Sequence, residues 1–298
     1  MRQEIDLSLP PVTPQEMRDL LRAVRITREN GTFYWEREKK YHEILAFLTH
    51  LLVLERDMKR DRALLLLDGG CGKSYLSFVL NHVLTGKVKR PVHFIGVDAD
   101  PAIIQTCEGI ARDLGFRNME FRVGRALDQR FESPPDIVYA LHACDTATDE
   151  IIALGIRHRA MAVVVAPCCQ REVKRTLDAR HPLSGIGHFH VFKERLAVML
   201  TDAIRALTLE AAGYGVKVVE FVPAKHTPKN ILLRARRRTY RPTPAALDAY
   251  RSLQATFGFR SSLETYLPEL FDGKGLPDID RDEQDIQDEK NQGLSCPS

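Results

Sequence analysis

An apolar run that ends in an acid and a glycine-rich turn is the feature that most restricts the fold of this 298-residue chain. Leu64-Leu-Leu-Leu leads into Asp68-Gly69-Gly70-Cys71-Gly72-Lys73-Ser74, and a second apolar run at 92–97 ends in Asp98. An apolar run followed by a glycine-rich turn is typical of a buried parallel strand that leads into a helix. The acid at the end of the second run stands where such folds bind the ribose hydroxyls of a nucleoside. The pattern predicts the nucleoside-binding half of a doubly wound sheet.

The turn has two interpretations that concern different ligands. Gly72-Lys73-Ser74 ends as the phosphate loop of nucleoside triphosphatases ends, but that loop needs a glycine where this chain has Leu67. A carboxylate at Asp68 would also repel phosphate, whereas it suits an ammonium group such as that of the methionine portion of S-adenosylmethionine. We therefore favour a methyl-donor loop; phosphate-loop binding, and a tight turn that binds nothing, remain the alternatives.

Short apolar runs alternate with amphipathic stretches along most of the chain. We expect helices at 14–30, 36–57, 74–84, 101–114, 147–157, 192–212, 243–256 and 262–271, and strands at 63–68, 92–97, 119–123, 136–141, 161–166, 216–222 and 231–236. The last two strands are joined by 223–230, which is too short for a crossover helix, so they must pair antiparallel. This predicts a Rossmann-like α/β fold of the class I methyltransferase type: a seven-stranded, mostly parallel sheet with an antiparallel last strand.

The predicted organisation has four parts. A helical extension at 1–60 precedes an S-adenosylmethionine-binding methyltransferase domain at 61–241, C-terminal helices at 242–272 and an acidic tail at 273–298 that we expect to be disordered. No apolar stretch is long enough for a membrane span, and the N-terminus lacks the apolar region of a signal peptide. With six scattered cysteines that form no disulfide framework, this predicts a cytoplasmic protein with reduced thiols.

Three motifs occur in one order: 68–77 (DGGCGKSYLS), 141–149 (LHACDTATD) and 166–170 (APCCQ). Together they resemble a group of S-adenosylmethionine-dependent methyltransferases with Ala-Thr-Asp after the fourth strand and Cys-Cys after the fifth. The group includes tRNA acceptor-stem 2′-O-methyltransferases and several methyltransferase-like proteins. Judged by the positions of these motifs, the resemblance covers about residues 35–240.

The resemblance implies a cofactor site of named residues. Asp68, Gly70 and Gly72 would line the methionine end of the donor, and Asp98 would accept hydrogen bonds from the ribose. Gly69, Ala99 and Leu141 would complete these two parts of the site. Where many relatives hold the adenine with an acid after the third strand, this chain has Arg125 and Ala126, so Asp128 or backbone groups are the alternatives there.

The candidate catalytic residues are His142 and Asp145, which stand at the end of the fourth strand, and Lys40, in a lysine-rich segment that resembles one in the group. His142 and Asp145 can remove or orient an acceptor proton. The alternatives are structural: His142 as a cap of the strand and Asp145 as the N-cap of the following helix.

Cys168, Lys229 and Asn230 are the candidate substrate-binding residues; Lys229 and Asn230 belong to a turn that is also compatible with plain solvent exposure. The adjacent Cys168 and Cys169 would point in opposite directions at a strand end, so we expect no metal site.

The leading hypothesis is an S-adenosylmethionine-dependent methyltransferase that acts on RNA, with tRNA as the first candidate. RNA rests on the group resemblance and on two basic segments, 37–40 and 234–241. The alternatives are a methyltransferase with a protein or small-molecule acceptor, a non-catalytic donor-binding interaction module, and a phosphate-loop-like nucleotide-binding protein.

Overall fold

The computed structural model describes residues 12–34, 37–143, 146–168, 171–176, 184–223, 227, 230–238 and 243–273. The predictions for Asp145, for Lys229 and for the tail from residue 274 lie outside the described residues. None of the described helices has the length and apolar character that a membrane crossing requires.

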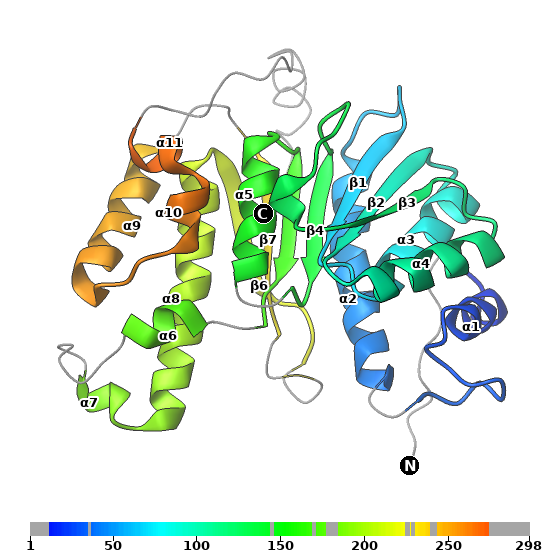
Figure 1. Cartoon of the computed structure of the whole chain (residues 1–298), viewed down its shortest axis with the longest axis horizontal. Coiled ribbons are helices and arrows are strands. Elements are labelled where there is room, and N and C mark those ends of the chain that lie inside the picture. The colour runs from blue at the N-terminus through cyan, green and yellow to red at the C-terminus, as the bar shows by residue number, and fades with distance from the viewer. Residues whose placement is uncertain are drawn as a thin grey trace, which may run out of the picture.

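Within the described residues, one seven-stranded sheet forms the centre of the molecule (Figure 1). Its strands are β1 (Leu64–Gly69), β2 (Val92–Asp98), β3 (Met119–Val123), β4 (Ile137–Leu141), β5 (Ala162–Ala166), β6 (Tyr214–Glu220) and β7 (Ile231–Arg237). They lie in the order β3-β2-β1-β4-β5-β7-β6, and β7 runs antiparallel to both of its neighbours. The class I methyltransferase topology predicted from the sequence is confirmed.

Helices cover both faces of the sheet. The longer ones are α1 (Pro14–Ala23), α2 (Arg37–Arg56), α3 (Tyr75–Asn81), α4 (Pro101–Asp113), α5 (Thr146–Arg157), α8 (His190–Ala211) and α9 (Pro244–Phe257). The shorter elements are η1 (His82–Val88), η2 (Ala126–Asp128), α6 (Arg171–Thr176), α7 (Ser184–Gly187), α10 (Ser262–Tyr266) and α11 (Pro268–Phe271). Figure 1 shows α9, α10 and α11 beside α8 at one side of the molecule and α1 beyond α4 at the other.

Two apolar clusters hold these layers together. Leu66 belongs to the cluster that includes α1 to α4, whereas its neighbour Leu67 belongs to the cluster that includes α5, α8 and the C-terminal helices. Ile137 and Val138 divide in the same way. Because successive side chains of a strand point to opposite faces, the continuous apolar strands of this chain are what a sheet covered on both faces requires.

Three predicted helices differ from the structure. The helix predicted over 14–30 ends at Ala23, because Arg25 takes a positive φ and a bridge pairs Thr27 with Phe33. The helix predicted over 262–271 is divided at Leu267, because the following Pro268 has no N–H to continue it. The helix predicted over 74–84 continues to Val88 as a π-helical turn.

Candidate functional site

A cavity of about 230 Å³ lies at the carboxyl ends of β1 and β4. The sheet order turns back between these two strands, since β1 is followed by β2 on one side and has β4 on the other. In open α/β sheets such a switch point is where ligands bind. Six of the residues predicted from the sequence line this cavity: Lys40, Asp68, Gly70, Gly72, Leu141 and His142.

The glycine-rich turn forms one wall of the cavity. Gly72 has a φ of +52°, and a Cβ added to it would meet no atom within 4 Å, so its backbone faces open space. Gly69 differs, because a Cβ there would lie 2.5 Å from Cγ1 of Ile151 in α5. Gly69 is therefore small to allow the packing of α5 and is not part of the cavity lining.

Asp68 is the buried acid of the site. Its carboxylate accepts hydrogen bonds from the Ser74 hydroxyl at 3.2 Å and from the Ser77 hydroxyl, which also contacts the Tyr139 hydroxyl at 2.7 Å. Burial raises the pKa of Asp68 to about 7, and the two serine bonds and the nearby Lys40 oppose that rise. Burial thus makes the charged form of Asp68 costly, and a cationic ligand would relieve that cost.

Asp98 braces the glycine-rich turn from the neighbouring strand. One carboxylate oxygen, Oδ2, accepts a hydrogen bond from the Gly72 N–H at 2.8 Å, and the other accepts from the Asp100 N–H at 3.1 Å. Asp98 is half-buried and Ala99 is exposed, outside the cavity lining. Their predicted contacts with a ribose remain a prediction.

His142 ends β4 at the cavity and is held by a residue that sequence reasoning missed. Its Nε2 lies 2.9 Å from Oε2 of Glu43 in α2, and Nζ of Lys40 lies 3.8 Å from the same carboxylate oxygen. Burial lowers the pKa of Lys40, against the opposing charges of Glu43 and Asp68. The sequence does hold one signal for Glu43: it is an acid among apolar residues at helical spacing, such as Ile44 and Phe47, which are buried on the same helix.

Cys168, which follows β5, packs against this strand end. Its Sγ donates to the backbone carbonyl of His142 at 3.7 Å and to that of Ala143 at 3.8 Å. It also lies near the ammonium group of Lys40. The structure therefore places Cys168 beside the candidate catalytic residues. Among the described residues, no group of three or more His, Cys, Asp or Glu side chains could hold a metal ion.

A comparison with known protein families agrees with the interpretation of the sequence around this cavity. Residues 39–176 match the family model of a methyltransferase domain. The matched segment carries β1 to β5 and every cavity residue named above.

Curated relatives share only part of their length with this chain. The human protein described as glutathione S-transferase C-terminal domain-containing protein is 30% identical over 145 residues, which is 41% of this chain and 22% of the relative. The protein of the same description from Bos taurus is 26% identical over 192 residues, which is 56% of this chain and 29% of that protein. The chain thus spans less than a third of the length of these relatives.

Among solved structures, this chain is similar to a magnesium protoporphyrin IX methyltransferase from Synechocystis with bound S-adenosylmethionine. That match has 13% identity and a TM-score of 0.43 and covers 74% of this chain and 90% of the other. A geranyl diphosphate methyltransferase matches with 15% identity and a TM-score of 0.40, over 63% of this chain and 77% of the other.

Three more of the predicted residues are not among those that line the cavity. The Arg125 guanidinium donates two hydrogen bonds to one carboxylate oxygen of Glu150, at 3.1 and 2.6 Å. Ala126 is buried where η2 begins. The Asn230 side-chain amide donates to the Val222 carbonyl at 3.2 Å, so it closes the turn between β6 and β7. Roles of these residues toward a ligand remain predictions.

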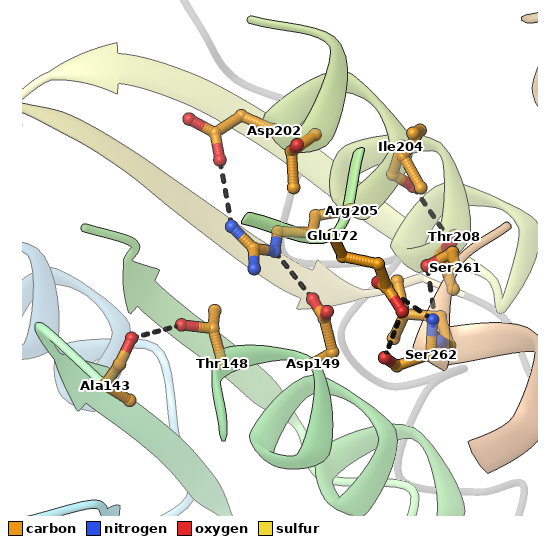
Figure 2. Close-up of polar contacts among 12 residues, drawn as sticks. Ala143, Thr148, Asp149, Glu172, Asp202, Ile204, Arg205, Thr208, Ser261 and Ser262 are labelled. Atoms are coloured by element: carbon orange, nitrogen blue, oxygen red, sulfur yellow. Dashed lines mark hydrogen bonds and ion pairs between the residues drawn. The ribbon is translucent and has the colours of Figure 1, made fainter. Parts of the chain in front are cut away.

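The Ala147-Thr148-Asp149 motif stabilises the fold around the cavity and does not line it. The Thr148 hydroxyl donates to the Ala143 carbonyl at 2.6 Å, which fixes the chain just after β4. Asp149 accepts a hydrogen bond from the Arg205 Nε at 2.7 Å, and Figure 2 shows this pair linking α5 to α8. The motif thus holds the residues that precede it in position.

The two basic segments make many contacts within the molecule. The guanidinium of Arg37 donates to the Arg25 carbonyl and lies over the Tyr34 ring. In β7, Arg236 pairs with Asp57 at 2.8 Å, and Arg237 is buried with hydrogen bonds to backbone carbonyls. Residues 239–241 lie outside the described residues.

Proposed function

We propose that this chain binds S-adenosylmethionine in the cavity at β1 and β4 and transfers its methyl group to an acceptor beside His142. The observation that carries this proposal is a buried carboxylate, Asp68, beside the open backbone of Gly72 at the switch point of a methyltransferase domain. The ammonium of the methionine portion would pair with Asp68, and the ribose would lie toward Asp98.

The size of the cavity fits only part of such a donor. About 230 Å³ is below the usual range of pockets that enclose a small ligand. We infer that the cavity holds the methionine portion and the reacting methyl group, while the nucleoside extends over the more open edge at Asp98. A donor placed in this way presents its methyl group toward Leu141 and His142, where an acceptor would enter.

The contacts of the turn argue against the phosphate-loop alternative. Three of its backbone N–H groups are already bonded: Cys71 to the Val97 carbonyl, Gly72 to Asp98 and Ser74 to the Cys71 carbonyl. A phosphate loop needs such groups pointing at its ligand. The acid at Asp68 adds repulsion, so a triphosphate would meet few donors and two carboxylates.

RNA is the acceptor that we propose, with tRNA as the first candidate. Because Arg236 and Arg237 are paired within the molecule, the support lies in the motif resemblance and in the exposed cations Lys39, Lys73 and Arg238. Lys73 also lines the cavity, where a phosphate of an RNA backbone would meet it. An RNA-modifying role in the cytoplasm follows as part of the same proposal.

A transfer assay tests both parts of the proposal. Radiolabelled S-adenosylmethionine would be incubated with the protein and with bulk tRNA, bulk ribosomal RNA or bulk protein in separate reactions. We expect label in tRNA, and its loss in the Asp68→Asn variant, which removes the carboxylate but retains the side-chain size. Label in protein alone would contradict an RNA acceptor. Donor binding without any transfer would favour the non-catalytic module.

A further inference from the structure

Glu43, His142 and the cavity form a line of contacts that the methyl-donor site does not by itself require. Nε2 of His142 lies 2.9 Å from the Glu43 carboxylate, and His142 lines the cavity whereas Glu43 is not among its lining residues. We infer that Glu43 positions His142 as the base that removes a proton from the methyl acceptor, so the acceptor is a neutral O–H or N–H group. This inference rests on the proposed methyltransferase function.

Two distant segments bring these residues together. Glu43 lies in the second turn of α2 and is almost fully buried, while His142 follows the last residue of β4. His142 takes a φ of +69°, a region in which residues other than glycine are uncommon and which occurs often at functional sites. Its second ring nitrogen, Nδ1, has no hydrogen-bond partner among the described residues.

The carboxylate decides which ring nitrogen is the base. A carboxylate only accepts hydrogen bonds, so Glu43 favours the neutral tautomer of His142 that carries its proton on Nε2. Nδ1 then keeps a lone pair and is the atom that can take a proton from a group in the cavity. The same orienting role of an acid toward a histidine is found in hydrolytic triads, which shows how much the tautomer matters to catalysis.

The transfer step balances with these groups. The acceptor oxygen or nitrogen attacks the methyl carbon of the sulfonium, a new O–C or N–C bond forms, and the C–S bond breaks with its electron pair left on sulfur. The donor becomes a neutral thioether. The acceptor proton moves to Nδ1 of His142, and the resulting imidazolium is stabilised by the Glu43 carboxylate at Nε2. A proton is later released to water.

The other titratable groups near His142 are consistent with this role. Lys40 shares the Glu43 carboxylate at 3.8 Å and is largely desolvated, Asp68 lines the same cavity, and the Cys168 thiol contacts the His142 carbonyl. No second carboxylate is bonded to the ring among the described residues. Glu43 is therefore the positioning residue of His142.

Nitrogen-15 NMR of the imidazole, with S-adenosylhomocysteine bound, tests the inference without a known acceptor. In the wild-type protein we expect the Nε2–H tautomer to exceed the Nδ1–H tautomer by about tenfold or more, the effect of one hydrogen bond to a charged group. Glu43→Gln should reduce that ratio by roughly threefold or more, since a hydrogen bond to a neutral acceptor has about half the free energy. A predominant Nδ1–H tautomer in the wild type would overturn the inference.

A matched control comes from a second glutamate–histidine pair. Oε2 of Glu120 lies 3.5 Å from Nε2 of His93, and both side chains are exposed on the β2–β3 edge. Glu120→Gln should leave the tautomer of His142 and the rate of methyl transfer unchanged. A change in the His142 tautomer as large as that in Glu43→Gln would show that the effect does not come from the contact with Glu43.

Single-turnover transfer to bulk tRNA gives the second readout. His142→Asn, which tolerates the left-handed backbone, should slow transfer by about 10² to 10⁴-fold, and Glu43→Gln by a smaller factor, with unchanged affinity for S-adenosylhomocysteine. Transfer at the wild-type rate in His142→Asn would refute the inference alone. Failure of the wild-type protein to bind S-adenosylhomocysteine would instead refute the proposed function.

Discussion

Asp68 shows how a single buried acid determines the chemistry of the site. It lies at the end of β1 with two serine hydroxyls as partners and little exposure to solvent. Its raised pKa of about 7 follows mainly from that burial. In the unfolded chain Asp68 has an ordinary carboxyl pKa and releases its proton at a lower pH than it does in the folded protein. The free energy of unfolding therefore depends on pH through this residue.

The sign of that dependence leads to the first prediction. A raised pKa contributes stability at low pH, and the contribution is lost as the pH rises from about 4 toward 7, at roughly 1.4 kcal/mol per pH unit at most. The Asp68→Asn variant cannot ionise at this position. The free energy of unfolding of the variant minus that of the wild type should therefore increase over this pH range and stay constant above pH 8. Urea unfolding at pH 5, 6, 7 and 8 measures the difference. A difference independent of pH would contradict the raised pKa.

At this scale the sequence identified the residues with the strongest patterns. Asp68, Gly72 and His142 stand at strand ends, where side chains of parallel strands converge, and the structure brings them together. Glu43 could not be assigned in this way, because its position against His142 depends on how α2 packs over the sheet, 99 residues away along the chain. The apolar spacing around Glu43 indicates that this acid is buried, but no local pattern indicates which distant residue it contacts.

The link between α5 and α8 holds the end of β4 in place. Arg205 of α8 is buried and bonded to both Asp149 of α5, at 2.7 Å, and Asp202 of its own helix, at 3.2 Å (Figure 2). Removing one member of a buried ionic network leaves the remaining charges without compensation. The network therefore stabilises the elements that position Ala143 and His142.

The second prediction concerns this network. Arg205→Met should lower the free energy of unfolding by about 3–5 kcal/mol, because two buried carboxylates lose their cation. Arg22→Met is the matched control, since Arg22 forms an exposed pair with Asp19 on α1 and should change stability by less than about 1 kcal/mol. Urea unfolding of both variants measures the contrast. Equal effects would contradict a stabilising role of the network.

Elements were predicted better in the centre of the sheet than at its surface. The strands were predicted from apolar runs, which a sheet covered on both faces requires. The predicted strand positions agree with the structure. The helix over 14–30 was predicted too long because Val24 and Ile26 continue an apolar spacing. They are buried as parts of a turn that Asn30-Gly31 and the Thr27–Phe33 bridge close.

On the scale of the molecule, both ends of the chain contribute to the core. The C-terminal helices bury Tyr250, Phe259, Leu263, Leu267 and Leu270 in the cluster that includes Leu67 and Val138. Burial of each large apolar side chain is worth about 1.5–3 kcal/mol. Five of them together approach the total stability of a typical domain.

A third prediction follows from this packing. A chain that ends at residue 242 should lose its cooperative thermal transition or melt far below the full-length protein, because one face of α8 becomes exposed. Circular dichroism during heating measures the change. The matched control is a chain that ends at residue 273, which retains α9 to α11 and should melt like the full-length protein. If the chain that ends at residue 242 melted like the full-length protein, α9 to α11 would be dispensable for stability.

The acceptor is the part of the account that neither the topology nor the fold determines. The strands, the antiparallel hairpin and the glycine-rich turn followed from apolar periodicity and turn chemistry, which act locally. Recognition of an acceptor depends on surface charge, and the arginines that looked available in 234–241 are partly bonded within the sheet. Pairing of that kind is visible only after the chain has folded.

The central claim is that the cavity at Asp68 binds a methyl donor. Isothermal titration calorimetry with S-adenosylhomocysteine and, separately, with ATP measures it most directly. We predict one molecule of S-adenosylhomocysteine per chain, at least tenfold weaker binding in Asp68→Asn from the loss of one charge-assisted contact, and no binding of ATP. Binding of ATP in place of S-adenosylhomocysteine, or unchanged affinity for S-adenosylhomocysteine in Asp68→Asn, would contradict the account.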